Sequence, residues 1–315
     1  MTRALLLAVL ALHGSQVQAP PTFGSGVEVV HLDVFVTQDG EPVRGLRADN
    51  FVVLDNGVRQ EVRLVALEDV ASSVVLVFDT SGSVAGRGLQ DLKEAGEVVL
   101  DGLRRSDRAA LITFADSPHL RIGSTRDLPR VRRQLGAVQA GGRTALYDGI
   151  YAGLALPTDG LQPLVVVFTD GADTASWLTP EQVLDEAWAS RAVVQVVTLE
   201  RSRGILDPAF GRINRRSAFP GVSGGNPAFA SLVARDAGRL RWLKDVADRT
   251  GGLYWSAEST GRLKATFAQI LEDMADRYVL AFEPKGVALE GVHELQVTLE
   301  GAKGQVRARE RYVIR

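Results

Sequence analysis

The feature that most constrains the fold is an alternation of short apolar runs with helix-period segments, which begins at Val74 and ends near Asp276. The apolar runs are too short for helices and rich in β-branched residues, so they predict buried strands. The expected strands are Val74–Phe78, Ala109–Phe114, Leu164–Thr169, Val193–Leu199 and Leu253–Ser256, with Pro118–Ile122 as a short edge strand. The expected helices are Leu89–Leu103, Leu128–Val138, Ala145–Leu156, Pro180–Ser190, Ala234–Thr250 and Gly261–Asp276. This order predicts an α/β fold with a doubly wound, mainly parallel sheet.

The first of these strands ends in a group of oxygen-bearing side chains. Asp79 follows the apolar run directly, and Ser81 and Ser83 come next at alternate positions. In open α/β sheets, ligands bind at the carboxyl ends of the strands. Oxygen donors without a nearby His or Cys suit a hard cation, so the stretch predicts a site for Mg²⁺ or Mn²⁺.

Two later stretches carry similar donors. Thr144 follows Gly141, Gly142 and Arg143 just before an expected helix, and the glycines let the backbone approach a ligand closely. Asp170 follows the strand Leu164–Thr169 as Asp79 follows its own strand. The ends of these two strands can be neighbours across a switch point of the sheet.

Both ends of the chain have the pattern of antiparallel β-structure. The strands expected there are Val27–Val36, Phe51–Leu54 and Glu61–Leu67 before the α/β part, and Tyr278–Phe282, His293–Leu299, Gln305–Arg309 and Tyr312–Ile314 after it. Neither half has enough strands to bury both faces of a sheet. We therefore expect one small antiparallel β-sandwich built from both termini, formed by residues 24–69 and 277–315 around an α/β domain of residues 70–276.

Residues 201–231 interrupt the alternation with a composition rich in Gly, Pro, Ser, Asn and Arg. They predict an irregular insert with five arginines and one acidic residue, Asp207. Long loops without secondary structure are uncommon in compact domains. Two interpretations stay open, a solvated loop and a contact surface for an acidic partner.

The first 19 residues have the layout of a secretory signal peptide. A basic start is followed by the apolar run Ala4–Leu12 and by Val17-Gln18-Ala19, which predicts a secreted or periplasmic bacterial protein. No later segment has the length and apolarity of a membrane helix. The chain has no cysteine, which excludes disulfides and zinc–thiolate sites. A formal net charge of −2, without blocks of like charge, gives no indication of nucleic-acid binding.

Taken together, the oxygen-bearing stretches resemble a known site. The set Asp79-x-Ser81-x-Ser83, Thr144 and Thr169-Asp170-Gly171 resembles the metal-ion-dependent adhesion site of von Willebrand factor A domains, over about Val74 to Asp276. The flanks resemble secreted proteins of the acidobacterial von Willebrand factor A-related group, through Asp33-Val34-Phe35-Val36, Gly45-Leu46, Asn50-Phe51 and Arg307-Ala308-Arg309. The resemblance implies one divalent cation ligated directly by Ser81 and Ser83, and by Thr144 directly or through water. Asp79 and Asp170 would hold metal-bound waters.

These residues predict a binding module and not an enzyme. Neutral hydroxyls compensate a metal's charge incompletely, so an Asp or Glu of a protein partner is a favourable further ligand. The alternatives are a metal-dependent hydrolase or phosphatase, and a structural module in which the metal is incidental. Asp79 as a phosphoryl nucleophile ranks low because Ser81 stands where a second acid is usual. A further alternative, for Asp79 and the two serines alone, is that they only cap a turn and a helix start.

Other candidate residues carry less weight. Asp148 and Asp173 are expected to support the site or to sit in turns. Gly221–Gly225 fits the pattern Gly-x-Ser-x-Gly but lacks the strand and helix that a nucleophile elbow needs. The histidines outside the signal segment are scattered without metal-ligand spacing, so surface or β-face roles are expected. They are His31, His119 and His293.

Overall fold

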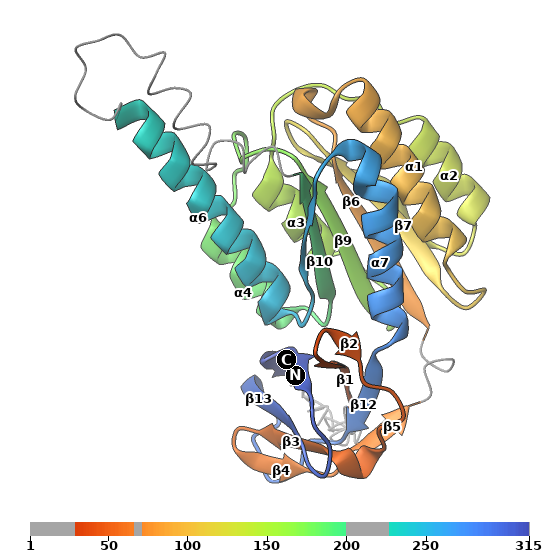
Figure 1. Ribbon diagram of the computed structural model, residues 1–315, viewed down its shortest axis with the longest axis vertical. Coiled ribbons are helices and arrows are strands. Elements are labelled where there is room, and N and C mark those ends of the chain that lie inside the picture. Colours follow the sequence, from red (N-terminus) through yellow and green to blue (C-terminus); the bar gives the residue numbers. More distant parts are fainter. Residues whose placement is uncertain (1–28, 66–70, 200–226, 315) are drawn as a thin grey trace, which may run out of the picture.

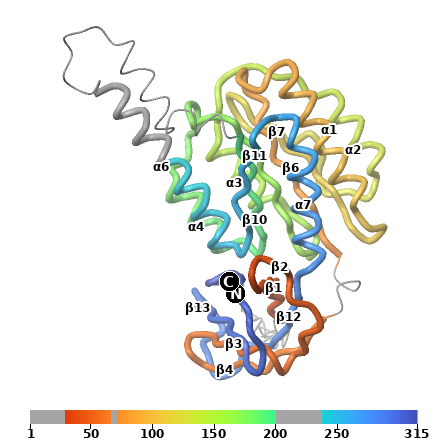
Figure 2. Tube along the Cα trace, in the orientation of Figure 1, coloured from red at the N-terminus to blue at the C-terminus, as the bar shows by residue number. Residues whose placement is uncertain are grey.

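The computed structural model describes residues 29–65, 71–199 and 227–314, with only the backbone described over 227–237 (Figure 1). The signal segment at residues 1–19, the Gly221–Gly225 motif and residues 200–226 of the insert lie outside this range. Within it, a large α/β part lies beside a smaller part made of strands, and helix α7 leads from the first into the second (Figure 2).

A six-stranded sheet forms the centre of the α/β part. Its order is β11 (Tyr254–Ala257), β10 (Val193–Leu199), β9 (Gln162–Thr169), β6 (Ser72–Asp79), β7 (Arg108–Phe114) and β8 (Pro118–Thr125). All neighbours pair in parallel except β8, which pairs antiparallel to β7 at the edge. The predicted strands, including the edge strand, are therefore present within one to three residues of their expected ends. Every residue of β6 is buried, which explains its nearly continuous apolar sequence.

Helices cover both faces of this sheet, each over its own apolar cluster (Figure 1). One face carries α1 (Arg87–Asp101), α2 (Leu128–Gly136) and α7 (Leu263–Ala275), and the other carries α3 (Leu146–Leu154), α4 (Pro180–Ala189) and α6 (Pro227–Arg249). The two clusters use alternate residues of the same strands: Leu76 and Phe78 face one layer, Val75 and Val77 the other. The sheet is thus doubly wound, as predicted.

Local sequence signals mark the starts of both α4 and α6, but only the start of α4 was predicted from them. Thr179 caps α4 and Gln182 completes a capping box, with Pro180 at the first helical position. The expected start of α6 at Ala234 was wrong, because the helix begins at Pro227. The predicted insert 201–231 therefore overlaps this helix by its last residues. Proline is favoured at the first position of a helix, and Pro227 is the local signal for this earlier start.

Strands from both ends of the chain pair with one another in what we call the terminal β-region, residues 29–65 and 278–314. One sheet has the order β14 (Gln305–Ala308), β1 (Val30–Gln38), β12 (Tyr278–Phe282), β5 (Arg63–Val65), with β2 (Glu41–Pro42) beside β1. The other has the order β15 (Arg311–Ile314), β13 (Gly291–Leu299), β3 (Phe51–Asp55), β4 (Val58–Gln60). The two sheets contribute to one apolar cluster. The sandwich and the domain limits at residues 70 and 277 stay predictions.

Hairpin turns fix the register within this region. Asp39 and Gly40 have φ of 55° and 86°, and Asn56 and Gly57 have φ of 47° and 80°. Two consecutive residues with positive φ make the turn type that suits a two-residue hairpin loop. The N-terminal strands do not form a sheet of their own, since β1 and β3 lie in different sheets and β5 pairs with β12.

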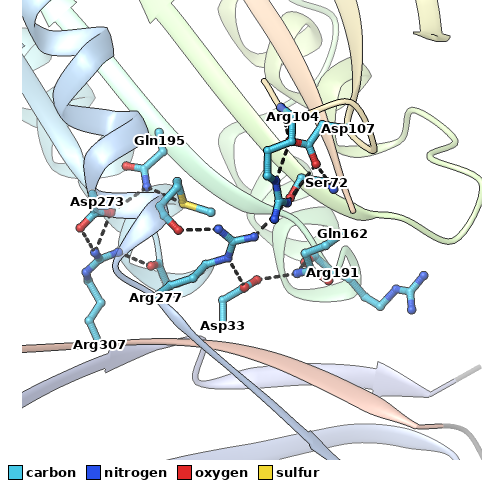
Figure 3. A network of polar contacts seen from close by, with 12 residues as sticks. Asp33, Ser72, Arg104, Asp107, Gln162, Arg191, Gln195, Asp273, Arg277 and Arg307 are labelled. Atoms are coloured by element: carbon cyan, nitrogen blue, oxygen red, sulfur yellow. Dashed lines mark hydrogen bonds and ion pairs between the residues drawn. The ribbon is translucent and has the colours of Figure 1, made fainter. Parts of the chain in front are cut away.

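A buried polar junction joins the terminal β-region to the α/β part (Figure 3). The Arg277 guanidinium donates to Asp33 at 2.8 Å, and the two side chains are 5% and 2% exposed. Asp33 also accepts from Gln162 at 2.6 Å, and Arg277 donates to Ser72 at 3.2 Å. Ser72 and Gln162 are the first residues of β6 and β9. The junction therefore lies at the amino ends of the strands whose carboxyl ends carry Asp79 and Asp170.

Candidate metal site

Asp79 is the last residue of β6 and is fully buried. Its Oδ1 accepts from the Ser81 backbone N–H at 2.9 Å, and its Oδ2 accepts from the Thr169 hydroxyl at 2.8 Å. Thr169 ends the neighbouring strand β9, in register with β6. The chain connects these two strands through β7 and β8 on the far side of β6, so the site lies at the switch point of the sheet.

The two serines and Asp170 form a chain of hydrogen bonds. Ser81 Oγ lies 3.0 Å from Ser83 Oγ, and Ser83 Oγ donates to Asp170 Oδ1 at 2.6 Å. Ser81 precedes a short 3₁₀ turn, Gly82–Val84, but its side chain makes no capping hydrogen bond, and α1 has Gly86 as its N-cap. Neither serine hydroxyl caps a helix. The Asp79 carboxylate does brace the turn, so the turn-capping alternative accounts for one residue of three.

Thr144 is brought to the same place by the glycine-bearing loop before α3. Gly82 donates its N–H to the Gly142 carbonyl at 3.1 Å, and Gly141 donates to the Thr80 carbonyl at 2.8 Å. Gly142 has φ of 85°, and an added Cβ would collide with the Asp116 carboxylate. The loop therefore needs glycine at this position in order to pack against the 79–83 turn.

The five predicted residues converge on one space. A Cβ built on Gly171 would lie 3.5 Å from Thr144 Oγ1 and 3.9 Å from both Asp79 Oδ2 and Ser83 Oγ. Oxygens from three separate segments thus face the small gap that the missing side chain of Gly171 leaves. Ser81 and Asp170 are connected to this group of oxygens by their hydrogen bonds with Ser83. We call this arrangement of oxygen atoms, at the carboxyl ends of β6 and β9, the cradle.

The donor set suits a hard divalent cation. It comprises three hydroxyls and two carboxylates, and among the described residues there is no cluster of three or more His, Cys, Asp or Glu side chains. Burial raises the pKa of Asp79, and the nearby Asp170 raises it further, while hydrogen bonds from Ser81 and Thr169 lower it. No ion pair joins Asp79 or Asp170 to a Lys, Arg or His of the described chain. A cation in the cradle would supply the missing positive charge.

Sequence reasoning missed several supporting residues. Thr169 belongs to the motif Thr169-Asp170-Gly171, but no role was predicted for it, and its hydroxyl donates to Asp79 Oδ2 at 2.8 Å. Arg239 of α6 donates to the Gly171 carbonyl at 2.9 Å, which ties that helix to the site; nothing near it in the sequence signals this contact. Asp173 accepts from the Leu146 N–H at 2.8 Å, and Asp148 accepts from Leu178 at 2.9 Å, so both have the supporting role expected of them.

The histidines lie away from the cradle. His31 lies on β1, His119 on β8 and His293 on β13. His293 is fully buried, and its Nδ1 lies 2.8 Å from Asp55 Oδ1. The expected β-face role is therefore met by His293, while a surface role for it was wrong.

Comparisons with known proteins agree with the fold. Residues 74–172 match the model of the von Willebrand factor type A domain. Human inter-alpha-trypsin inhibitor heavy chain H4 is 28% identical over 131 residues, which is 37% of this chain and 14% of that protein. The magnesium-chelatase 60 kDa subunit of Cereibacter sphaeroides is 34% identical over 108 residues, 32% of this chain and 19% of that protein. The chain thus matches only a small part of the length of these relatives.

One solved structure supports the likeness of fold over more of the chain. It is the von Willebrand factor type A protein from Catenulispora acidiphila, with a TM-score of 0.50 and 12% identity, covering 89% of this chain and 76% of that one. At this identity the match concerns the fold alone.

No described helix combines the length and the apolar character that a membrane span requires.

Proposed function

We propose that the part of the chain that matches the model of the von Willebrand factor type A domain holds one Mg²⁺ or Mn²⁺ ion and binds, through it, an acidic side chain of a partner protein. The observation that carries the proposal is the cradle beside Gly171, where hydroxyls from two loops face a buried carboxylate that has no cationic partner in the described chain. Such a carboxylate is unfavourable unless a cation offsets it.

Each residue has a role in this proposal. The hydroxyls of Ser81, Ser83 and Thr144 would hold the cation, and Asp79 and Asp170 would accept hydrogen bonds from its waters. The cation supplies a position at which water exchanges for a carboxylate oxygen. Thr169 and the Ser81 N–H fix the orientation of the Asp79 carboxylate, and the Gly82–Gly142 bond keeps the two hydroxyl-bearing loops together.

The partner is proposed from the charge of the site. The groups proposed to touch the cation are neutral hydroxyls and water, with the two carboxylates held beyond its waters, so the charge of the cation is incompletely compensated where an Asp or Glu side chain would bind. Nucleic acid is not proposed as a partner. We place the protein outside the cytoplasm, secreted or periplasmic, because its first 19 residues have the layout of a signal peptide. The acidobacterial von Willebrand factor A-related group stays a prediction based on the flanks.

Titration calorimetry with Mn²⁺ and Mg²⁺ tests the metal. Wild type should bind one ion, and Asp79→Ala should lose at least tenfold in affinity because one side of the cradle is removed. Asp185→Ala is the matched control, since it removes an exposed carboxylate from α4 and should leave the titration unchanged. Equal binding by wild type and Asp79→Ala would overturn the site assignment.

Capture from the secretome of the native host tests the partner. Immobilised protein should retain a partner in Mg²⁺ and release it in EDTA, and Asp79→Ala should retain none. If the partner stays bound in EDTA, the metal is incidental and the binding surface lies elsewhere.

The hydrolase alternative has its own test. In a phosphatase and esterase screen with Mg²⁺ and Mn²⁺, we expect no turnover that depends on Asp79, so wild type and Asp79→Ala should give the same result. Turnover that depends on Asp79 would replace the binding proposal with a catalytic one.

A further inference from the structure

Trp177 is the most exposed large apolar side chain of the described part of the chain. It is 91% exposed, compared with 67% for Leu289 and 58% for Leu120. Of the other described tryptophans, Trp242 is 8% exposed and Trp188 and Trp255 are half-buried. Single exposed apolar residues are normal on protein surfaces, so exposure alone does not make a binding site. What distinguishes Trp177 is how it is held and where.

The backbone of Trp177 is fixed by a buried carboxylate. Asp148, in the first turn of α3, is 8% exposed and accepts from the N–H of Trp177 at 3.0 Å and from that of Leu178 at 2.9 Å. Leu178 packs into the apolar cluster under α3, α4 and α6. The Leu178 side chain is therefore packed inward, whereas the side chain of the preceding residue, Trp177, is exposed.

The rest of the loop between β9 and α4 is tied down in the same way. Asp173 accepts from the Leu146 N–H at 2.8 Å, and the Ser176 hydroxyl accepts from the Tyr147 N–H at 3.0 Å. Side chains of the loop thus satisfy the first N–H groups of α3, which a helix cannot satisfy internally. A large side chain held on such a braced loop loses little further freedom when it binds.

This loop borders the metal site directly. The Thr144 N–H donates to the Thr174 hydroxyl at 3.0 Å, and the Thr144 carbonyl accepts from the N–H groups of Thr174 and Ala175 at 2.8 and 3.1 Å. Trp177 is two residues beyond Ala175, so their Cα atoms are at most about 7 Å apart. A peptide whose carboxylate reached the cradle would lie beside the loop that carries Trp177.

We propose that Trp177 is a second contact for the partner of the metal site, and that the partner carries a large apolar or aromatic side chain within two positions of its metal-bound Asp or Glu. The inference rests on the proposed function. Tryptophan is the residue type that most often dominates binding energy at protein interfaces, because its flat apolar surface is large and has few rotatable bonds. A cation together with an exposed indole on a neighbouring braced loop recognises a short acidic–apolar motif better than either group alone.

Selection of displayed random peptides tests the motif directly, since random peptides cover all short acidic–apolar combinations. Peptides are selected on the full chain in Mg²⁺ and eluted with EDTA. We expect enrichment of Asp or Glu with Phe, Tyr, Trp, Leu or Met one or two positions away. Selection on Trp177→Ala should keep the acidic residue and lose the apolar one.

A synthetic peptide from that selection then gives affinities. Trp177→Ala should bind it at least tenfold more weakly, with Trp177→Phe between the two and Leu289→Ala, a distant exposed apolar residue, equal to wild type. The Mg²⁺ affinity of Trp177→Ala, measured by calorimetry, should equal that of wild type.

The outcomes separate the two proposals. Acidic peptides without an apolar neighbour, or equal peptide affinity for wild type and Trp177→Ala, would overturn the role of Trp177 and leave metal-dependent binding standing. A fall in Mg²⁺ affinity of Trp177→Ala would overturn it too, because the residue would then act through the cradle. If no peptide is released by EDTA from wild type, the proposed function itself fails.

Discussion

A buried carboxylate lies at each end of strands β6 and β9, Asp33 of the terminal β-region at their amino ends and Asp79 at their carboxyl ends, and the two have opposite surroundings. Strands β6 and β9 begin at the junction with Ser72 and Gln162 and end at the cradle with Asp79 and Thr169. At the junction, Asp33 meets the Arg277 guanidinium at 2.8 Å and lies close to buried Arg309. At the cradle, Asp79 accepts hydrogen bonds from the neutral residues Ser81 and Thr169 and forms no ion pair with a cation of the described residues, and burial raises its pKa.

We infer from this difference that the junction has a structural role and that the cradle is the end at which a ligand binds. A buried carboxylate paired with a guanidinium is complete and binds nothing further. Beside this pair, Arg307 contacts Asp273 at 2.7 Å (Figure 3). The Arg307 guanidinium also lies over Phe35, with its carbon 3.7 Å from the ring centre. A buried carboxylate whose donors among the described residues are all neutral is unfavourable in its charged form, and we therefore propose that the cradle takes a cation from solution.

Breaking the junction should have the largest effect. Arg277→Met leaves Asp33 buried without its closest cation, which should lower the free energy of unfolding by roughly 3–5 kcal/mol. Urea denaturation measures it. Arg44→Ala removes an exposed partner of Asp276 and should change stability little. A small loss with Arg277→Met would mean that the junction does not hold the two parts together.

Filling the cradle should stabilise the protein almost as much. Mg²⁺ at about 100 times its dissociation constant should raise the free energy of unfolding by roughly 2.7 kcal/mol, since only the folded chain brings the five residues of the site together. Thermal unfolding with and without Mg²⁺ measures the shift. Asp79→Ala should show none, whereas Asp185→Ala should respond as wild type does. A melting temperature of Asp79→Ala that climbs with Mg²⁺ would count against the comparison.

A single methyl group should close the cradle. Gly171 has no constraint to positive φ, and the Cβ of Gly171→Ala would make ordinary contacts of 3.5 Å or more, so the fold should tolerate it. The methyl would occupy the space on which the oxygens converge, and metal affinity should fall about tenfold, roughly 1.4 kcal/mol. Gly136→Ala, where an added Cβ meets nothing within 4 Å, is the control. Unchanged calorimetric affinity would place the metal elsewhere.

The smallest effect concerns pH. The pKa of Asp79 is raised in the folded protein, so the metal-free fold binds more protons than the unfolded chain between pH 3.8 and the raised value. Stability without metal should therefore fall as pH rises through this window, and Asp79→Asn should remove the dependence. Metal affinity should change in the opposite direction, because a proton competes with the cation. If the stabilities of wild type and Asp79→Asn vary with pH in the same way, the pKa of Asp79 is not raised in the folded protein.

The sequence was sufficient for the cradle because its signals are local. Asp79 and Asp170 each follow an apolar strand, and strand ends of a parallel sheet meet at one edge, so these two could be brought together without coordinates. Thr144, which follows a glycine pair, was added by the resemblance to the adhesion site. The contacts that were missed are long-range. Arg239 reaches Gly171 across 68 positions, and His293 meets Asp55 across 238.

The exposure of Trp177 also could not be predicted from pattern. Trp177 and Leu178 are adjacent apolar residues, and their local pattern does not show that Leu178 packs inward while Trp177 is exposed. The Asp148 carboxylate that accepts from both N–H groups is 29 and 30 positions away. The pairing of β5 with β12 is of the same kind, because the register between strands some two hundred residues apart leaves no local mark.

The central claim is that the cradle holds a cation, and crystals grown with Mn²⁺ test it most directly. Anomalous difference density should give one Mn²⁺ peak within ligand distance of the Ser81, Ser83 and Thr144 hydroxyls, and the peak should be absent in crystals of Asp79→Ala. A cradle without Mn²⁺ at saturating concentration, or a peak bound elsewhere with the cradle empty, would contradict the account.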